Sequence, residues 1–146
     1  PNHFLMSTPT QDSSLATDLS KEIINEKEQA RMAYHAGSEA IKEKRYEEAL
    51  KHLGKSIFFN PSNLSALVAR ANIFCKTGEL TKALKDAEEA ITIGSYAQAY
   101  SAKGYVLFLQ KRYEEAVNSY NKALELEPNN ATVKNRKQAA EREISK

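Results

Sequence analysis

The side chains that could do chemistry in this chain are one cysteine, three histidines and three pairs of adjacent glutamates. Cys75 has no base near it in the sequence, so the pattern indicates an unreactive thiol on a helix rather than an activated nucleophile. His35 and His52 lack a second ligand at the spacing of a zinc site, and His3 lies in a polar leader. We therefore expect no metal site.

The glutamate pairs resemble the two carboxylates of an acid–base catalyst. They are Glu47 and Glu48, Glu88 and Glu89, and Glu114 and Glu115. Adjacent side chains on a helix point in different directions, which places these pairs on a solvated surface. The sequence also has no glycine-rich phosphate loop. These patterns predict a protein that is not an enzyme and that has no cofactor.

Basic side chains gather near the end of the chain. They are Lys134, Arg136, Lys137, Arg142 and Lys146. Two glutamates interrupt them and no aromatic residue accompanies them, which favours a solvated helix surface over a phosphate-binding one. Nucleic-acid binding is therefore an alternative function that the sequence disfavours. The net charge of +2 is nearly balanced and indicates no partner.

Length and composition set the class of protein. The chain has 146 residues, which fits one domain with its own core. Its single cysteine rules out an internal disulfide and favours a reducing compartment, so we expect a cytoplasmic protein. No apolar run approaches the roughly 20 residues that a membrane-spanning helix needs, and no signal-peptide pattern is present. We expect no contact with a membrane.

The elements that position these side chains repeat along the chain. "KRYEEAL" at 44–50 and "KRYEEAV" at 111–117 are nearly the same, and "GELTKAL" at 78–84 lies between them. The helical candidates are 46–59, 63–76, 80–93, 97–110, 113–126 and 130–145, with short polar breaks between them. Strand patterns are absent from the sequence, so the predicted fold class is all-α. Two helices in each period of 33 to 34 residues are typical of a helical solenoid.

In these features the chain resembles tetratricopeptide repeat (TPR) proteins over about residues 30–130. The small residue of each second helix falls on Ala49, Ala83 and Ala116, and that of each first helix on Gly37, Ala71 and Gly104. The resemblance implies a right-handed superhelical solenoid of three helix-turn-helix units, at about 30–63, 64–96 and 97–130. Residues 131–146 would form a capping helix. The first helix would extend back to an N-cap at Ser20, and residues 1–19 would be a disordered leader or a cloning remnant.

Two departures from the regular pattern have structural consequences. The second unit lacks the closing proline of the others and is one residue short at "IGSY", which predicts a tighter turn there. Lys44 and Lys111 stand where the second unit has Gly78. A left-handed backbone at those lysines would cost about 1 kcal/mol each.

The resemblance implies that the first helix of each unit lines a concave groove that binds a partner. By register, the candidate groove residues are Arg31, Tyr34, Ser38, Lys42, Val68, Asn72, Lys76, Gln98, Ser101, Tyr105 and Leu109. We therefore predict a scaffold whose groove binds a peptide or helix of another protein. In the capping helix, Val133, Ala140 and Ile144 are expected to face the last repeat, and Arg136 to face water.

Two further functions are alternatives to this prediction. Co-chaperones of similar architecture grip the acidic tail of heat-shock chaperones with a Lys, two Asn, a Lys and an Arg, whose donors pair with carboxylates. At those five positions this chain has Tyr34, Ser38, Ala69, Gln98 and Ala102, so none matches. A chaperone is therefore an alternative partner that the clamp positions do not support. Self-association through the apolar "SIFF" at 56–59 is the other alternative.

Overall fold

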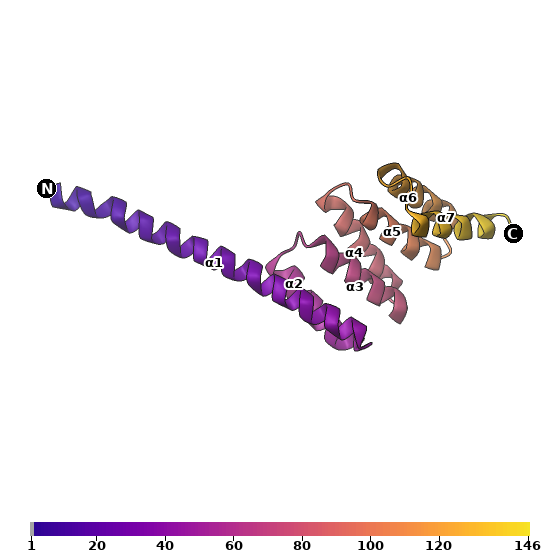
Figure 1. Cartoon of the computed structure of the whole chain (residues 1–146), viewed down its shortest axis with the longest axis horizontal. Coiled ribbons are helices and arrows are strands. Elements are labelled where there is room, and N and C mark those ends of the chain that lie inside the picture. The colour runs from indigo at the N-terminus through magenta and orange to yellow at the C-terminus, as the bar shows by residue number, and fades with distance from the viewer. Residues whose placement is uncertain (1) are drawn as a thin grey trace.

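The structure is a computed structural model that describes the backbone from residue 2 and the side chains from residue 14. Its described residues form seven helices and no strand, which confirms the all-α prediction (Figure 1). The helices are α1 (Asn2–Lys42), α2 (Tyr46–Phe59), α3 (Leu64–Thr77), α4 (Leu80–Ile93), α5 (Ala97–Leu109), α6 (Tyr113–Leu126) and α7 (Ala131–Ile144). None of them combines the length and the apolar character needed to cross a membrane.

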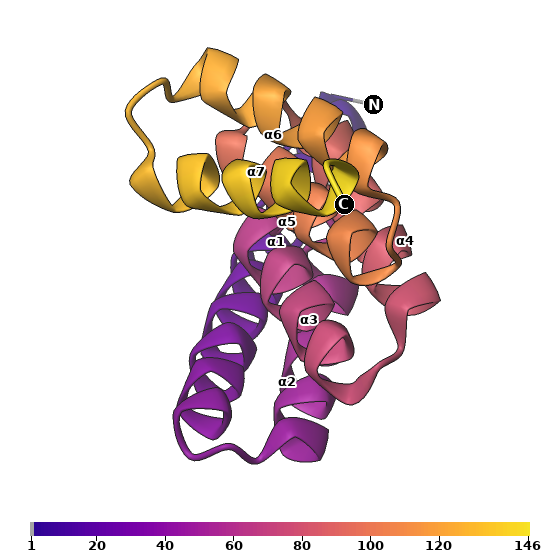
Figure 2. The same ribbon diagram turned by 90° about the vertical axis from the view of Figure 1, so that its right-hand side faces the viewer.

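Three antiparallel helix pairs stack into a solenoid. The pairs are α1 with α2, α3 with α4, and α5 with α6, and α7 packs on α6 at the C-terminal end (Figures 1 and 2). The first helices of the second and third pairs, α3 and α5, also contact each other, and α5 contacts α7. This arrangement confirms the predicted helical-repeat solenoid and lines up α3, α5 and α7 along one side.

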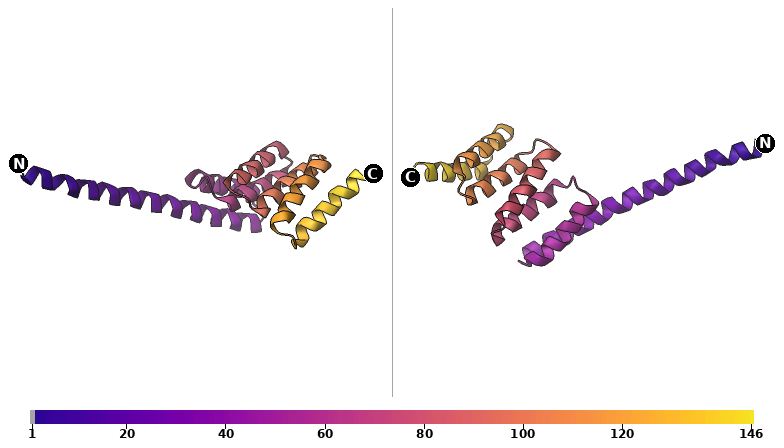
Figure 3. Two further views of the ribbon diagram at one scale, coloured as in Figure 1. Left: turned by 90° about the horizontal axis from the view of Figure 1, so that it is seen from above. Right: turned by 180° about the vertical axis from the view of Figure 1, so that it is seen from behind.

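The first helix begins much earlier than the sequence predicts. α1 starts at Asn2 and projects away from the solenoid, where the sequence predicts a disordered leader over residues 1–19 (Figures 1 and 3). Ser20 is not the N-cap, because its hydroxyl donates to the carbonyl of Ala16 at 2.9 Å inside the helix. Packing on α2 anchors the C-terminal part of α1. An anchored helix extends at little cost, since each added residue gains a hydrogen bond without new nucleation.

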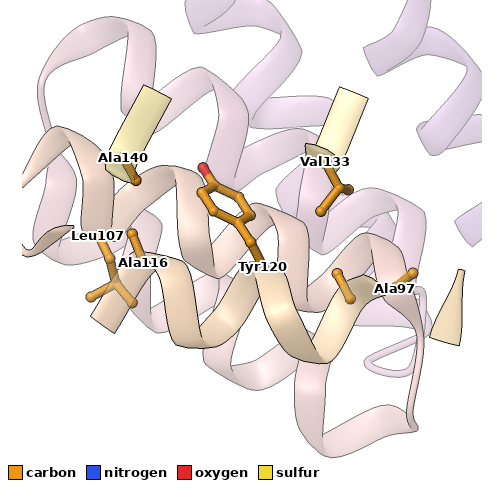
Figure 4. Close-up of a cluster of buried hydrophobic side chains, with 7 residues drawn as sticks. Ala97, Leu107, Ala116, Tyr120, Val133 and Ala140 are labelled. Atoms are coloured by element: carbon orange, nitrogen blue, oxygen red, sulfur yellow. The ribbon is translucent and has the colours of Figure 1, made fainter. Parts of the chain in front are cut away.

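Small residues let the paired helices approach closely. Ala49, Ala83 and Ala116 are completely buried at the helix crossings. A Cβ added at Gly104 would lie 2.6 Å from a ring carbon of Tyr120, so this glycine is needed for the contact between α5 and α6. Among the side chains that the structure describes, Tyr120 is the largest that is fully buried, and it stands at the centre of the C-terminal core cluster (Figure 4). The register of small residues in the sequence therefore marks the crossings.

The turns inside each helix pair share one geometry. Lys44 and Lys111 have φ values of 62° and 64°, and Gly78 has 82°. In each turn the next residue donates its N–H to a carbonyl five residues back, at 2.8 to 2.9 Å, which closes a Schellman motif. Both lysines thus adopt the left-handed backbone, at a cost of about 1 kcal/mol each. The connection at 94–96 has three residues, against four at 60–63 and 127–130, and is the shorter link that the sequence predicts.

An ion pair joins α3 to α4 in the second unit. The Nε and Nη2 atoms of Arg70 donate to the two carboxylate oxygens of Asp86, both at 2.8 Å. Asp86 is only 5% exposed, so its charge depends on this arginine for compensation. The hydrogen bond to Asp86 raises the pKa of Arg70 against the opposing effect of burial. The pair fixes the orientation of α3, which carries part of the concave side.

We expect Gly78→Ala to lower the free energy of unfolding by about 1 kcal/mol, because alanine is strained at positive φ. Gly54→Ala is the matched control, since an added Cβ meets nothing within 4 Å at either position and Gly54 lies inside α2. That change should stabilise the fold by about 0.5 to 1 kcal/mol. Urea unfolding of both variants measures the difference. Equal effects would contradict the role of the backbone angle.

We expect Asp86→Asn to cost about 2 kcal/mol, because it leaves the half-buried Arg70 without its charge partner. Glu115→Gln serves as the control: it breaks the exposed ion pair with Arg112 and should leave the melting temperature unchanged. Thermal unfolding followed by circular dichroism compares the two. A small loss for Asp86→Asn would show that the α3–α4 pair does not depend on this contact.

Candidate functional site

A pocket of about 300 Å³ opens on the side of the solenoid where α3, α5 and α7 meet. Val68, Ala102 and Val133 give it an apolar floor. The other lining residues are polar: Asn72, Gln98, Ser101, Glu127, Asn130, Thr132 and Arg136. Three of these carry carboxamides, which can donate and accept at once. The pocket therefore combines a small apolar surface with groups that suit a peptide backbone.

Capping and burial fix the position of α7, the far wall of this pocket. Asn130 caps the helix, because its side-chain oxygen accepts the N–H of Val133 at 3.1 Å. Val133 and Ala140 are buried against the last repeat, as predicted, and Tyr120 of α6 points between them (Figure 4). Ile144 also faces the last repeat, where it lines a hollow with Tyr113 and Glu114, but it stays 44% exposed. One face of α7 is thus held down, and the adjoining face turns towards α5.

Arg136 lies on that adjoining face and reaches across the pocket. Its guanidinium carbon stands 4.7 Å from the centre of the Tyr105 ring, and its Nη1 donates to Oγ of Ser101 at 3.3 Å. The prediction that Arg136 faces water is therefore wrong. Stacking on an aromatic face stabilises a guanidinium, and the aliphatic stem can lie along apolar surface. Both contacts favour the folded-back position.

Two neutral groups lie close enough to Arg136 for its charge to affect their pKa values. Burial raises the pKa of the Cys75 thiol, and the charge of Arg136 only partly offsets this. Burial also raises the pKa of the Tyr120 hydroxyl well above its ordinary value, again with Arg136 opposing. Both groups therefore remain protonated at neutral pH. Neither supplies a negative charge to balance Arg136.

The pocket brings together four of the predicted groove residues. Val68 and Asn72 come from α3, and Gln98 and Ser101 come from α5. Tyr105 joins them as the ring beneath Arg136. These residues recur at the spacing of one helical turn on two neighbouring first helices, which is the reason the register placed them together.

The other six predicted residues lie outside this pocket. Arg31 is ion-paired with Glu28, and Lys42 with Glu39, each on its own helix. Tyr34 packs against the core of the first unit. Lys76 lies 6.0 Å from the centre of the Tyr46 ring. The remaining two, Ser38 and Leu109, are half-buried. Their role in binding remains a prediction.

Sequence reasoning missed the contribution of the capping helix. The lining residues that it overlooked are Glu127, Asn130, Thr132, Val133 and Arg136. The signal was present, because Val133, Arg136 and Ala140 recur at three and four residues and so share one side of a helix. A basic residue next to two buried ones is better placed to pack on the last repeat than to face water.

The five clamp positions carry no cation in the structure. Tyr34 and Ala69 pack against the first-unit core, and Ala102 is 5% exposed in the pocket floor. Ser38 is half-buried, and only Gln98 is exposed. In the part of the chain that the structure describes, no group of histidines, cysteines and carboxylates could hold a metal ion. The chemistry available in the pocket is hydrogen bonding, apolar contact and the opposite charges of Arg136 and Glu127.

Family models described as tetratricopeptide repeat match residues 34–97 and 97–130. The chain belongs to the tetratricopeptide repeat family. The first TPR domain of Spaghetti (RPAP3), solved with the HSP90 peptide SRMEEVD, superimposes with a TM-score of 0.78 at 27% identity. That comparison covers 82% of this chain and 96% of the other. The TPR domain of Arabidopsis OM64 gives 0.76 at 26% identity, covering 80% and 98%.

Curated relatives are much longer than this TPR chain. The Hsp70-Hsp90 organizing protein of Triticum aestivum is 37% identical over 95 residues, which are 64% of this chain and 16% of the relative. The small glutamine-rich tetratricopeptide repeat-containing protein 2 of Mycosarcoma maydis is 34% identical over 110 residues. That match covers 75% of this chain and 31% of the relative. The similarity is therefore to the TPR portion of larger proteins.

We expect Cys75 to be alkylated by iodoacetamide more slowly at pH 8 in the folded chain than in the urea-unfolded chain, because burial raises its pKa. Arg136→Gln should slow the reaction further, since it removes the charge that favours the thiolate. Arg142→Gln, a change of the same kind at an exposed position of α7, should leave the rate unchanged. A faster reaction in Arg136→Gln would show instead that Arg136 shields the thiol.

Proposed function

We propose that this TPR chain is a non-catalytic adaptor that holds a peptide segment of a partner protein in the pocket between α3, α5 and α7. The observation that carries the proposal is the pocket itself, whose walls come from three helices and whose floor is apolar. An extended peptide presents alternating backbone donors and acceptors, and carboxamides pair with both. The floor leaves room for a small aliphatic side chain.

The pocket belongs to rigid elements, which favours binding by a preformed surface. The N-cap of Asn130 fixes one end of α7, and the ion pair of Arg70 with Asp86 orients α3. A site whose side chains are already held in place loses less conformational entropy when a ligand binds. The same fixed geometry limits which peptides fit. We place this adaptor in the cytoplasm, in keeping with its single half-buried cysteine.

A chaperone tail is the second candidate ligand. The similar TPR domain of Spaghetti (RPAP3) was solved with an HSP90 peptide, and relatives are named as Hsp70-Hsp90 organizing proteins. The peptide SRMEEVD carries several carboxylates close together. The clamp positions here have no cation, and Arg136 offers one guanidinium, so most of those carboxylates would lose water without gaining a charged donor. A less acidic peptide fits better.

Self-association and nucleic-acid binding have less support as functions. Phe58 of the "SIFF" segment is 79% exposed, so an apolar surface exists there, but its neighbours Ile57 and Phe59 are half-buried. On α7, Arg136 turns into the pocket, which removes one charge from the basic surface that nucleic acid would need. Both functions remain alternatives to the peptide-binding role.

To test the adaptor role, we would screen the chain against an array of random heptapeptides and map the strongest binder by amide shifts in labelled protein. We expect shifts on α3, α5 and α7, and a loss of about five- to tenfold in affinity for Asn72→Ala or Gln98→Ala, since each removes a hydrogen bond to the ligand. Glu89→Ala, an exposed change on α4, is the control. Shifts confined to other helices would contradict the proposed site.

The chaperone alternative has its own measurement. SRMEEVD with a free and with an amidated C-terminus would be titrated into the same labelled protein. Because the clamp donors are missing, we expect binding at least about tenfold weaker than that of the best array peptide. Micromolar binding that amidation abolishes, with shifts at Ser38 and Gln98, would instead establish the chaperone tail as the ligand.

A further inference from the structure

Over the described part of the chain, Arg136 differs from Arg31, Lys42 and Arg70 in having no carboxylate as a partner. Arg31 and Lys42 are ion-paired on their own helix, and Arg70 is ion-paired across to Asp86. Within the described residues, no carboxylate lies at ion-pair distance from Arg136, and Ser101 is its one hydrogen-bond acceptor. The Tyr105 ring stabilises this half-buried charge, but none of the negative groups that the structure describes balances it in the free protein.

The geometry of the side chain prepares it for an anion. Tyr105 covers one face of the guanidinium at 4.7 Å, and Ser101 occupies one donor at 3.3 Å. Together they fix the plane of the group. A guanidinium has five N–H donors in a rigid fork, so most of its edge remains available to a carboxylate in the bidentate arrangement.

The surroundings also limit how much negative charge the pocket accepts. Cys75 and Tyr120 are held neutral by burial, so neither competes with a ligand for Arg136. Glu127 lines the same pocket and lies beyond ion-pair distance of Arg136. Its carboxylate would repel a second acidic group on the ligand. One cation and one anion in a small pocket suit a ligand with a single negative charge.

From these contacts we infer that Arg136 anchors the single carboxylate of a bound peptide, next to a small aliphatic side chain on the floor of Val68, Ala102 and Val133. The inference rests on the proposed peptide-binding function and specifies its ligand. The anchor lies on the capping helix, away from the five clamp positions. The carboxylate belongs to the C-terminus of the peptide or to one Asp or Glu side chain.

The test uses three pools of random heptapeptides passed over the immobilised chain. The first pool has a free C-terminal carboxylate and no Asp or Glu, the second is amidated with one Asp or Glu, and the third is amidated without acids. We expect the chain to retain the first or second pool about tenfold better than the third, because a charge-assisted hydrogen bond is stronger than a neutral one. The pool that wins identifies the source of the carboxylate.

Variants connect that preference to Arg136. Arg136→Gln should abolish it, and Arg136→Lys should keep part of it, because lysine retains the charge without the fork or the stacking. Arg142→Gln removes the same charge from an exposed position of α7 and should change nothing. Circular dichroism checks that each variant is folded. If Arg136→Gln unfolds, Arg136→Lys and Tyr105→Leu replace it in the test. Tyr105→Leu removes the ring that supports the guanidinium, and both variants should weaken the preference for the carboxylate.

The outcomes separate this inference from the adaptor role. Equal retention of all three pools, or a preference that survives in Arg136→Gln, overturns the carboxylate anchor and leaves peptide binding intact. Retention of no pool by the unaltered chain overturns both. Peptides selected by the unaltered chain should also share a small aliphatic residue at a fixed distance from the carboxylate. A selected set without such a residue counts against the proposed floor contact.

Discussion

The close approach of paired helices is the constraint on which this structure depends. Alanine or glycine stands at each crossing, and any larger residue would push the helices apart: even one added methyl at Gly104 would overlap the ring of Tyr120. Because every pair solves the same packing problem, the pairs stack with a constant offset, and α3, α5 and α7 come to share one side. The pocket between these three helices exists because of that regularity.

The capping helix does more than end the repeat. A terminal helix in a solenoid must bury an apolar face and present a polar one, and α7 does so with Val133 and Ala140 on the buried side. The residue between those two faces, Arg136, can reach neither the core nor bulk water fully. It folds over Tyr105, where its charge is stabilised by the ring and its donors face the pocket. Arg136 thus both packs the capping helix against α5 and supplies a charged group to the pocket.

The sequence predicted what depends on backbone periodicity and left open what depends on side-chain conformation. The repeat gave the helix pairs, the position of Lys44 and Lys111 in the turns, and the short link at 94–96. It missed the start of α1, because Ser20 looks the same inside a helix as at its beginning. It could not show that a glutamate one turn away binds the side chain of Arg31. The repeat register places the backbone of a residue, but it does not determine which neighbouring group a long side chain contacts.

A pocket with one cation and several carboxamides selects its ligand by different interactions from those of a site with several cations. In a site with several lysines and arginines, each added carboxylate of the ligand gains a cationic partner. The affinity then rises with the number of acidic groups on the ligand and falls steeply with salt concentration. In the proposed complex, a second carboxylate would meet Glu127 instead of a donor, and no hydrogen bond would replace its lost hydration. Selectivity in that proposed complex then rests on shape over the apolar floor and on contacts of Asn72 and Gln98 with the peptide backbone. The TPR fold can therefore stay the same while the pocket selects its ligand by shape more than by charge.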